Sequence, residues 1–184
     1  MSRNKRCKTL CFDFTGLQVV EPILPSELVR YFYLNVAYKS TYRILIDYAE
    51  DADIQTYADN NHMVVAACKT KKISENVPEG TILFTQDICK RSKKARRLKI
   101  KERLPIALFR HMRNAFAHFR ITQEGEYIVM HDEIVRNGRR TLTMSGKVQT
   151  EQLEGLCNHI LLQAENRYEI IIENNQNSTN NENN

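Results

Sequence analysis

Apolar and polar positions repeat with a helical period over most of the chain. After an extended lead-in over residues 1–25, with some strand-like alternation, the pattern predicts a helix that begins at Ser26, a residue suited to capping. An acidic stretch over residues 50–53 marks a bend, and a second helix is predicted from about Ile54 to Ile73. Residues 74–80 are a loop by composition. A third helix is expected to begin near Thr85.

The clearest amphipathic segment runs from about Glu102 to Phe119, with Pro105 in the first turn, where a helix tolerates proline. At about 100° per residue, one broad arc of this helix is apolar. It contains Leu104, Leu108, Phe109, Met112, Ala115, Phe116 and Phe119. The opposite arc contains Arg110, His111, Arg113, Asn114, Ala117 and His118. We expect the apolar arc to be buried and the polar arc to be exposed.

After this helix the sequence pattern changes from a helical period to alternating apolar and polar residues. Asn137-Gly138 between two alternating segments predicts a β-hairpin. A last helix begins at Thr150, and the Asn-rich tail over residues 174–184 should be disordered because it lacks apolar residues. The expected fold class is therefore mainly α, a helical bundle over residues 26–173 with a β-hairpin inserted between the motif helix and the C-terminal helix.

Length and composition narrow the class of protein. A chain of 184 residues suits one domain, and no apolar stretch approaches the roughly 18 residues that span a bilayer. The five cysteines are scattered, which favours reduced thiols in the cytoplasm over a disulfide framework. Cys7 and Cys11 are spaced four apart, but no cluster completes a metal site. We therefore expect no membrane, metal or cofactor.

The net charge of +5 is concentrated in one segment. Between Lys90 and Arg103 there are nine basic residues and one acidic residue, which gives this segment a charge of +8. Such a run is either a solvated helix face or a surface that binds RNA phosphates. Its candidate RNA-binding residues are Lys93, Lys94, Arg96 and Arg97, joined by Arg110 from the next helix. Three further arginines at the hairpin, Arg136, Arg139 and Arg140, either extend this surface or keep the strand edge soluble.

The polar arc of the amphipathic helix carries the candidate chemistry. His118 can transfer a proton near neutral pH, Arg113 offers a planar cation for phosphate, and Asn114 can hydrogen-bond either. RNA supplies its own nucleophile, the 2′-hydroxyl, so its cleavage needs only these groups. The structural alternative is that arginine and histidine near a helix C-terminus simply stabilise the helix dipole.

The segment from Ile106 to His118, IALFRHMRNAFAH, resembles the signature of the HEPN superfamily (higher eukaryote and prokaryote nucleotide-binding domains). The later hairpin and long closing helix are similar to one bacterial subgroup of that superfamily. The resemblance implies a small helical bundle and a metal-independent endoribonuclease, with His118 as the proton-transfer residue, Arg113 as the phosphate ligand and Asn114 as the polar helper. It also implies a homodimer with a composite site.

Many members of that superfamily are toxins or phage-defence effectors, so an antitoxin or another regulatory protein is a further expected partner. Two other functions stay open. The protein is either a non-catalytic RNA- or nucleotide-binding module that uses the same surface, or a structural dimerisation protein.

Overall fold

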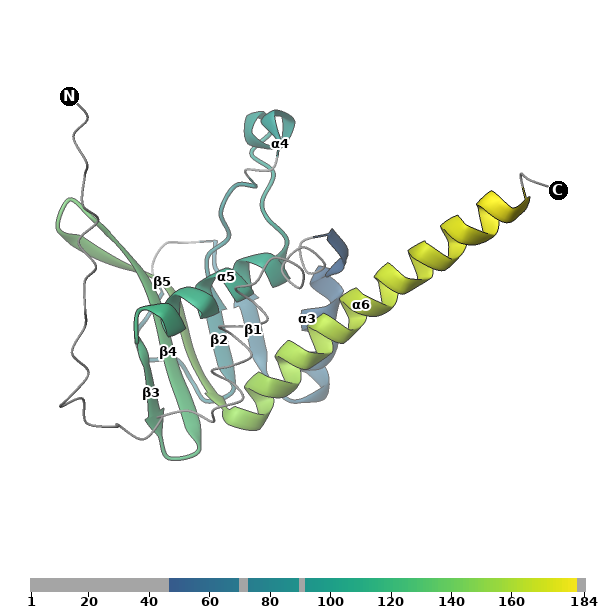
Figure 1. The fold of residues 1–184 in the computed structure, drawn as a ribbon. Helices are drawn as coiled ribbons and strands as arrows, with labels where there is room; N and C mark the ends of the chain where they lie inside the picture. Colours follow the sequence, from purple (N-terminus) through teal and green to yellow (C-terminus); the bar gives the residue numbers. More distant parts are fainter. Residues whose placement is uncertain (1–46, 70–72, 90–91, 182–184) are drawn as a thin grey trace, which may run out of the picture.

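A five-stranded mixed β-sheet lies at the centre of the protein (Figure 1). The computed structural model describes residues 47–69, 73–89 and 92–181, and the lead-in, the helix expected from Ser26, Cys7 and Cys11 lie outside these ranges. The strands, in the sheet order β1-β2-β5-β4-β3, are β1 (Val64–Ala67), β2 (Thr81–Phe84), β5 (Arg139–Gln149), β4 (Tyr127–Arg136) and β3 (Ile121–Glu124). β1 and β2 are parallel, and the other neighbours are antiparallel. The protein has an α/β fold, so the prediction of a mainly α helical bundle is wrong.

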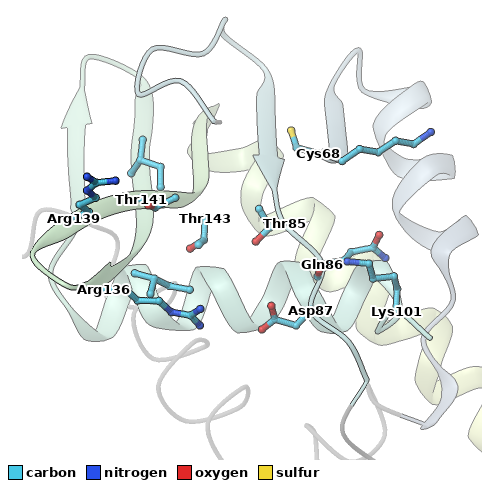
Figure 2. Close-up of a pocket in the computed structure, with 12 residues that line it drawn as sticks. Cys68, Thr85, Gln86, Asp87, Lys101, Arg136, Arg139, Thr141 and Thr143 are labelled. Carbon is cyan, nitrogen blue, oxygen red and sulfur yellow. Dashed lines mark hydrogen bonds between the residues drawn. The ribbon is translucent and has the colours of Figure 1, made fainter. Parts of the chain in front are cut away.

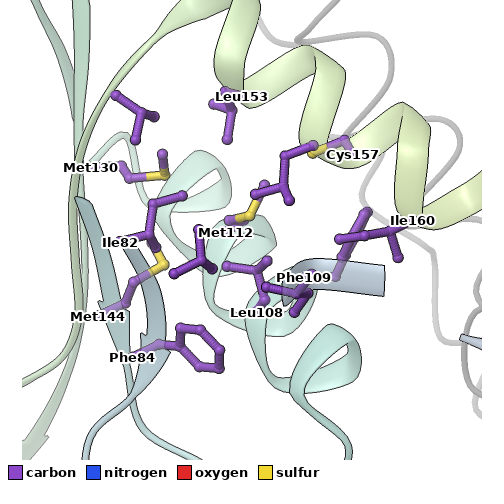
Figure 3. Packing of buried hydrophobic residues seen from close by; sticks show 14 of the residues in the cluster. Ile82, Phe84, Leu108, Phe109, Met112, Met130, Met144, Leu153, Cys157 and Ile160 are labelled. Carbon is purple, nitrogen blue, oxygen red and sulfur yellow. The ribbon is translucent and has the colours of Figure 1, made fainter. Parts of the chain in front are cut away.

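Three helices pack together and against this sheet. They are α3 (Asp51–Asn60), α5 (Leu104–Ala117) and α6 (Thr150–Asn181). Figure 3 shows the core between α5, α6 and the sheet, where Ile82, Phe84, Leu108, Phe109, Met112, Met130, Met144, Leu153 and Ile160 are all fully buried. None of the helices in the described part of the chain combines the length and the apolar character that crossing a membrane requires.

The helix predicted over residues 54–73 is two elements. α3 ends at Asn60, and His62 then takes a left-handed conformation with φ of 54°, which a continuing helix cannot contain. The β-branched pair Val64-Val65 follows and joins the sheet as β1. The acidic stretch before α3 begins the helix rather than bending the chain, because Glu50 and Asp53 form a capping box.

The helix predicted to begin near Thr85 is also wrong. The segment before Thr85 is β2, which has a neighbouring strand on each side. Consecutive residues of β2 are buried, so both of its faces are covered, and the strand is almost entirely apolar for that reason. After β2 the chain leaves the body as a two-legged arm, with the Cys89 amide donating to the Ile100 carbonyl at 2.8 Å. The basic run lies at the tip of this arm, on the short helix α4 (Lys93–Arg97) (Figure 1).

The β-hairpin and the last helix are confirmed. Asn137 and Gly138 both have positive φ, 51° and 72°, as the predicted two-residue turn between β4 and β5 requires. α6 begins at Thr150 and continues to Asn181, into the segment expected as a disordered tail. Near its middle, Arg167 donates to both carboxylate oxygens of Asp53, which attaches α6 to α3.

Candidate functional site

The motif helix is confirmed as α5, which is two residues shorter at each end than predicted. Pro105 lies in the first turn of α5, and the predicted apolar face of the helix is buried at Leu108, Phe109, Met112, Ala115 and Phe116. Arg103, just before the helix, donates to the carbonyl of Ala49 at 3.0 Å and so connects the start of α5 to the segment that precedes α3. The helix ends at Ala117, with His118 as its C-cap. The motif residues therefore occupy the last turn of a well-anchored helix.

Arg113 and His118 are both exposed at this end of α5. Arg113 donates from Nη2 to Oδ1 of Asn114 at 3.1 Å, and no acidic side chain pairs with its guanidinium within the described ranges. His118 uses its backbone N–H to close the helix on the Asn114 carbonyl, at 3.0 Å. Its imidazole makes no hydrogen bond or ion pair to any described residue. The cation and the imidazole thus share one end of the helix without contacting each other.

Asn114 links this exposed end to a buried ion pair. Its Nδ2 donates to Oδ2 of Asp132 at 3.2 Å, and the same oxygen lies 2.6 Å from Nδ1 of His111. His111 and Asp132 are 1% and 3% exposed. The other ring nitrogen of His111 lies 2.8 Å from the carbonyl of Thr85, which can only accept, so Nε2 carries a proton. Both ring nitrogens face acceptor oxygens, so His111 connects the Thr85 carbonyl to Asp132.

The surroundings of Asp132 favour its charged form. Burial raises the pKa of this carboxyl, but hydrogen bonds from His111, Asn114 and Thr143, together with the charge of His111, outweigh burial and leave the pKa below its ordinary value. Thr143 donates to Oδ2 at 3.2 Å, and the Glu133 amide donates to Oδ1 at 2.9 Å. Asp132 is thus a fixed anion under the motif helix.

A β-bulge helps to build this network. Asp132 is opposite Met144 but Glu133 is opposite Leu142, so Thr143 is an extra residue on β5. Bulges redirect side chains, and here the Thr143 hydroxyl turns toward Asp132 while its carbonyl accepts from the Thr85 amide at 2.9 Å. Residues from α5, β4, β5 and the segment directly after β2 therefore meet at one buried point.

The prediction that His111 belongs to an exposed polar arc is wrong. On the wheel it lies at about 340°, at the border of the apolar face, and the sheet supplies polar partners there. Asp132 and its role were missed, although the sequence carries a signal. Ile128, Met130 and Asp132 alternate with period two on one face of β4, which puts a carboxylate in line with two core residues.

Arg110 takes part in the base of the arm. Its Nη2 lies 2.5 Å from Oε1 of Glu102 and 3.5 Å from Oδ2 of Asp87. Two acids thus neutralise this predicted RNA-binding residue, in contrast to Arg113. Its guanidinium holds the two legs of the arm against α5.

The other predicted RNA-binding residues lie at the far end of α5 from the motif. All four are exposed on α4, and none forms an ion pair with a described residue: Lys93, Lys94, Arg96 and Arg97. The arm that carries α4 joins α5 at its N-terminus, whereas Arg113 and His118 lie at its C-terminus (Figure 1). Fourteen residues of helix separate the two ends by about 21 Å. One chain does not bring the basic tip and the motif together.

Phe119 is a site residue that the wheel misplaced. It was expected on the buried face, but the helix ends before it, and its side chain is 89% exposed. Its φ of 53° is left-handed, a conformation that costs a non-glycine residue roughly 1–2 kcal/mol. An exposed ring on a strained backbone directly after His118 is a surface on which a base can stack. The helix stop could not be read from the pattern, because no glycine or proline marks it.

In the described part of the chain, no group of three or more His, Cys, Asp or Glu side chains is arranged to hold a metal ion. No protein-family model matches the chain, and no curated protein or solved structure matches it either.

Proposed function

We propose that this protein is a metal-independent endoribonuclease, with His118 as the proton-transfer group and Arg113 as the ligand of the scissile phosphate. The observation that carries the proposal is the end of α5, where an arginine without an acidic partner among the described residues, an exposed imidazole and an exposed phenylalanine ring lie within seven residues of each other. These are the groups that bind a phosphate, move a proton and stack a base.

The chemistry needs no other reactant. The 2′-oxygen of RNA attacks the adjacent phosphorus, its proton passes to His118, and the bond from phosphorus to the 5′-oxygen breaks. The products are a 2′,3′-cyclic phosphate and a 5′-hydroxyl end. Arg113 offers two parallel N–H donors to the phosphate oxygens, where negative charge builds up. Asn114 orients that guanidinium through its side-chain oxygen.

The proposal includes a homodimer with a composite site. The attacking and leaving oxygens lie roughly on opposite sides of phosphorus, so one imidazole does not serve both. A second copy supplies a second His118, which protonates the leaving 5′-oxygen while the first accepts the 2′-proton. The proposed two-fold axis passes close to the C-terminal ends of the two α5 helices, where both His118 residues lie.

The motif resembles the HEPN signature, and this supports the roles of Arg113, Asn114 and His118. The mixed sheet is not the helical bundle that the resemblance implied, so the proposal rests on the motif and its surroundings and not on the fold. The proposed setting is the cytoplasm, where the enzyme acts as a toxin or phage-defence effector held in check by an antitoxin or another regulatory protein.

The test is cleavage of a mixed RNA pool by the purified full-length protein in excess EDTA. We expect His118→Ala to slow cleavage by about 10²–10⁴-fold and Arg113→Ala by about 10²–10³-fold, as for other proton-transfer and charge-stabilising groups. His62→Asn is the matched control, because His62 is also exposed but lies far along the chain, and asparagine tolerates its positive φ. An RNA with 2′-O-methyl groups should resist the wild-type enzyme, and cleaved ends should carry cyclic phosphate.

The outcomes separate the three functions. If both variants cleave like the wild type, the assignment of the site is wrong. If RNA binds in a salt-dependent manner but is never cut, and binding survives His118→Ala, the protein is an RNA-binding module. If Arg113→Ala changes only the oligomeric state, the surface is a structural dimer contact. Slowed growth on expression would agree only with the ribonuclease.

A further inference from the structure

A pocket of about 360 Å³ lies between the base of the arm and the far half of the β4–β5 hairpin (Figure 2). Thr85, Gln86 and Asp87 line one side, where the chain leaves β2, and Lys101 comes from the returning leg of the arm. The hairpin lines the other side. The volume falls in the range of pockets that bind small molecules.

The charge of this pocket is strongly positive. Four cations line it, Lys69, Lys101, Arg136 and Arg139, against one acid, Asp87, which already lies 3.5 Å from Arg110. None of the four forms an ion pair with a described residue. Such a lining attracts an anion.

The two arginines are placed in a way that an anion would stabilise. Arg136 and Arg139 are opposite each other across the hairpin, and like charges in that position repel. Arg140, the next residue, is different because it pairs with Glu133, which also binds Arg120. Within one hairpin, therefore, one arginine is neutralised and the two that line the pocket are not.

The rest of the lining suits a ligand larger than a bare ion. Two threonines, Thr85 and Thr141, offer hydroxyl groups, whereas the hydroxyl of the buried Thr143 already donates to Asp132. Ile134 and Leu142 add an apolar wall. Planar bidentate donors recognise phosphate, hydroxyls bind ribose or phosphate oxygens, and an apolar wall accepts a ring.

From these observations we infer that the pocket between the arm and the hairpin binds a nucleotide unit through its phosphate, with Arg136 and Arg139 as the phosphate ligands. The unit is either a free nucleoside monophosphate or the 5′-phosphorylated end of an RNA. The pocket is separate from the end of α5 that carries Arg113 and His118, and this inference does not require the protein to cleave RNA.

The test is calorimetric titration of the full-length His118→Ala variant, which leaves RNA probes intact, with each of the four nucleoside monophosphates. We expect at least one to bind, and the corresponding nucleoside without phosphate to bind at least tenfold more weakly. Arg136→Gln/Arg139→Gln should weaken binding at least tenfold. The matched control, Arg140→Gln/Lys147→Gln, removes the same charge outside the pocket lining and should leave the Kd within twofold of that of the parent.

Competition identifies the source of the nucleotide. If the pocket binds RNA ends, a short RNA with a 5′-phosphate should displace the bound monophosphate, and the same RNA with a 5′-hydroxyl should not. If neither RNA competes, the pocket binds free nucleotides. The inference is overturned if neither monophosphates nor 5′-phosphorylated RNA bind, or if the control variant loses as much affinity as the pocket variant. Cleavage plays no part in this measurement. The pocket inference can therefore fail while the ribonuclease proposal stands, and the ribonuclease proposal can fail while the pocket inference stands.

Discussion

Replacing Phe119 by asparagine should stabilise the protein and weaken its binding to RNA. The ring is 89% exposed, so its removal uncovers almost no core. The backbone at Phe119 is left-handed, with φ of 53°, and asparagine adopts that conformation more readily than phenylalanine. We expect a gain of about 1 kcal/mol in the free energy of unfolding. For a chain of this length, that raises the Tm by about 2–4 °C.

The loss on the RNA side should be larger than this gain. Stacking of a base on an aromatic side chain is worth about 1–3 kcal/mol, so the Kd should rise by about 5- to 140-fold. The Kd is measured with a 2′-O-methyl RNA, which cannot be cut, and the Tm by circular dichroism, because the chain has no tryptophan. Phe119→Tyr is the control, since it keeps the ring and should bind like the wild type. A lower Tm together with unchanged RNA affinity would refute this reasoning and make Phe119 a structural residue.

Three further predictions test the fold and its surfaces. Asp132→Asn should cost about 3 kcal/mol at pH 7, because both carboxylate oxygens accept from buried donors and the NH₂ group of asparagine cannot accept. The pKa of Asp132 is lowered in the folded protein, so the contribution of Asp132 to stability is complete above about pH 4 and is lost as the pH falls through the folded pKa. The Tm difference between Asp132→Asn and the wild type should therefore shrink at pH 3. As a control, Asp59→Asn at an exposed position should change the Tm little at either pH. Gly155→Ala should destabilise by about 1–3 kcal/mol in chemical denaturation, because the added Cβ overlaps the Tyr57 hydroxyl, and Tyr57→Phe in the same chain should recover part of the loss. The four cations of α4 are Lys93, Lys94, Arg96 and Arg97. Replacing all four with glutamine should reduce the slope of the logarithm of the RNA-binding constant against the logarithm of the salt concentration by about 3 for single-stranded RNA. An unchanged slope would exclude the arm from RNA binding.

The parts of the fold that the sequence predicts well are long or have distinctive turns. α5 and α6 have extended apolar stripes, and Asn137-Gly138 admits few conformations other than a hairpin turn. β1 and β2 have four residues each, too few to show a period of two, and β2 is buried in the middle of the sheet, so its apolar run looks like part of a helix. Missing these two strands changed the predicted fold class.

The site residues also fall into a group that the sequence predicts and a group that it does not. Arg113, Asn114 and His118 could be singled out because they are close in the sequence and lie on one helix. The Thr85–His111–Asp132 network joins residues that are 21 and 26 positions apart, and it depends on a bulge at Thr143. Contacts of that range follow from strand order and register, which a single sequence does not contain. The exposure of Phe119 depends on where α5 stops, and helix ends are the least certain part of any pattern.

The buried His111–Asp132 pair has a clearer role in positioning than in stability. A buried ion pair often gains little over apolar residues of the same size, so its presence in the core is weak evidence that it stabilises the fold. Asp132, however, is a carboxylate and can only accept, and it therefore holds the Asn114 amide with its nitrogen inward. The oxygen of that amide then faces outward and accepts from Arg113. A neutral, apolar core at this point would leave the amide free to rotate and present its NH₂ group to the guanidinium. The buried anion thus fixes the direction of the one exposed cation in the motif, two hydrogen bonds away, before any phosphate arrives.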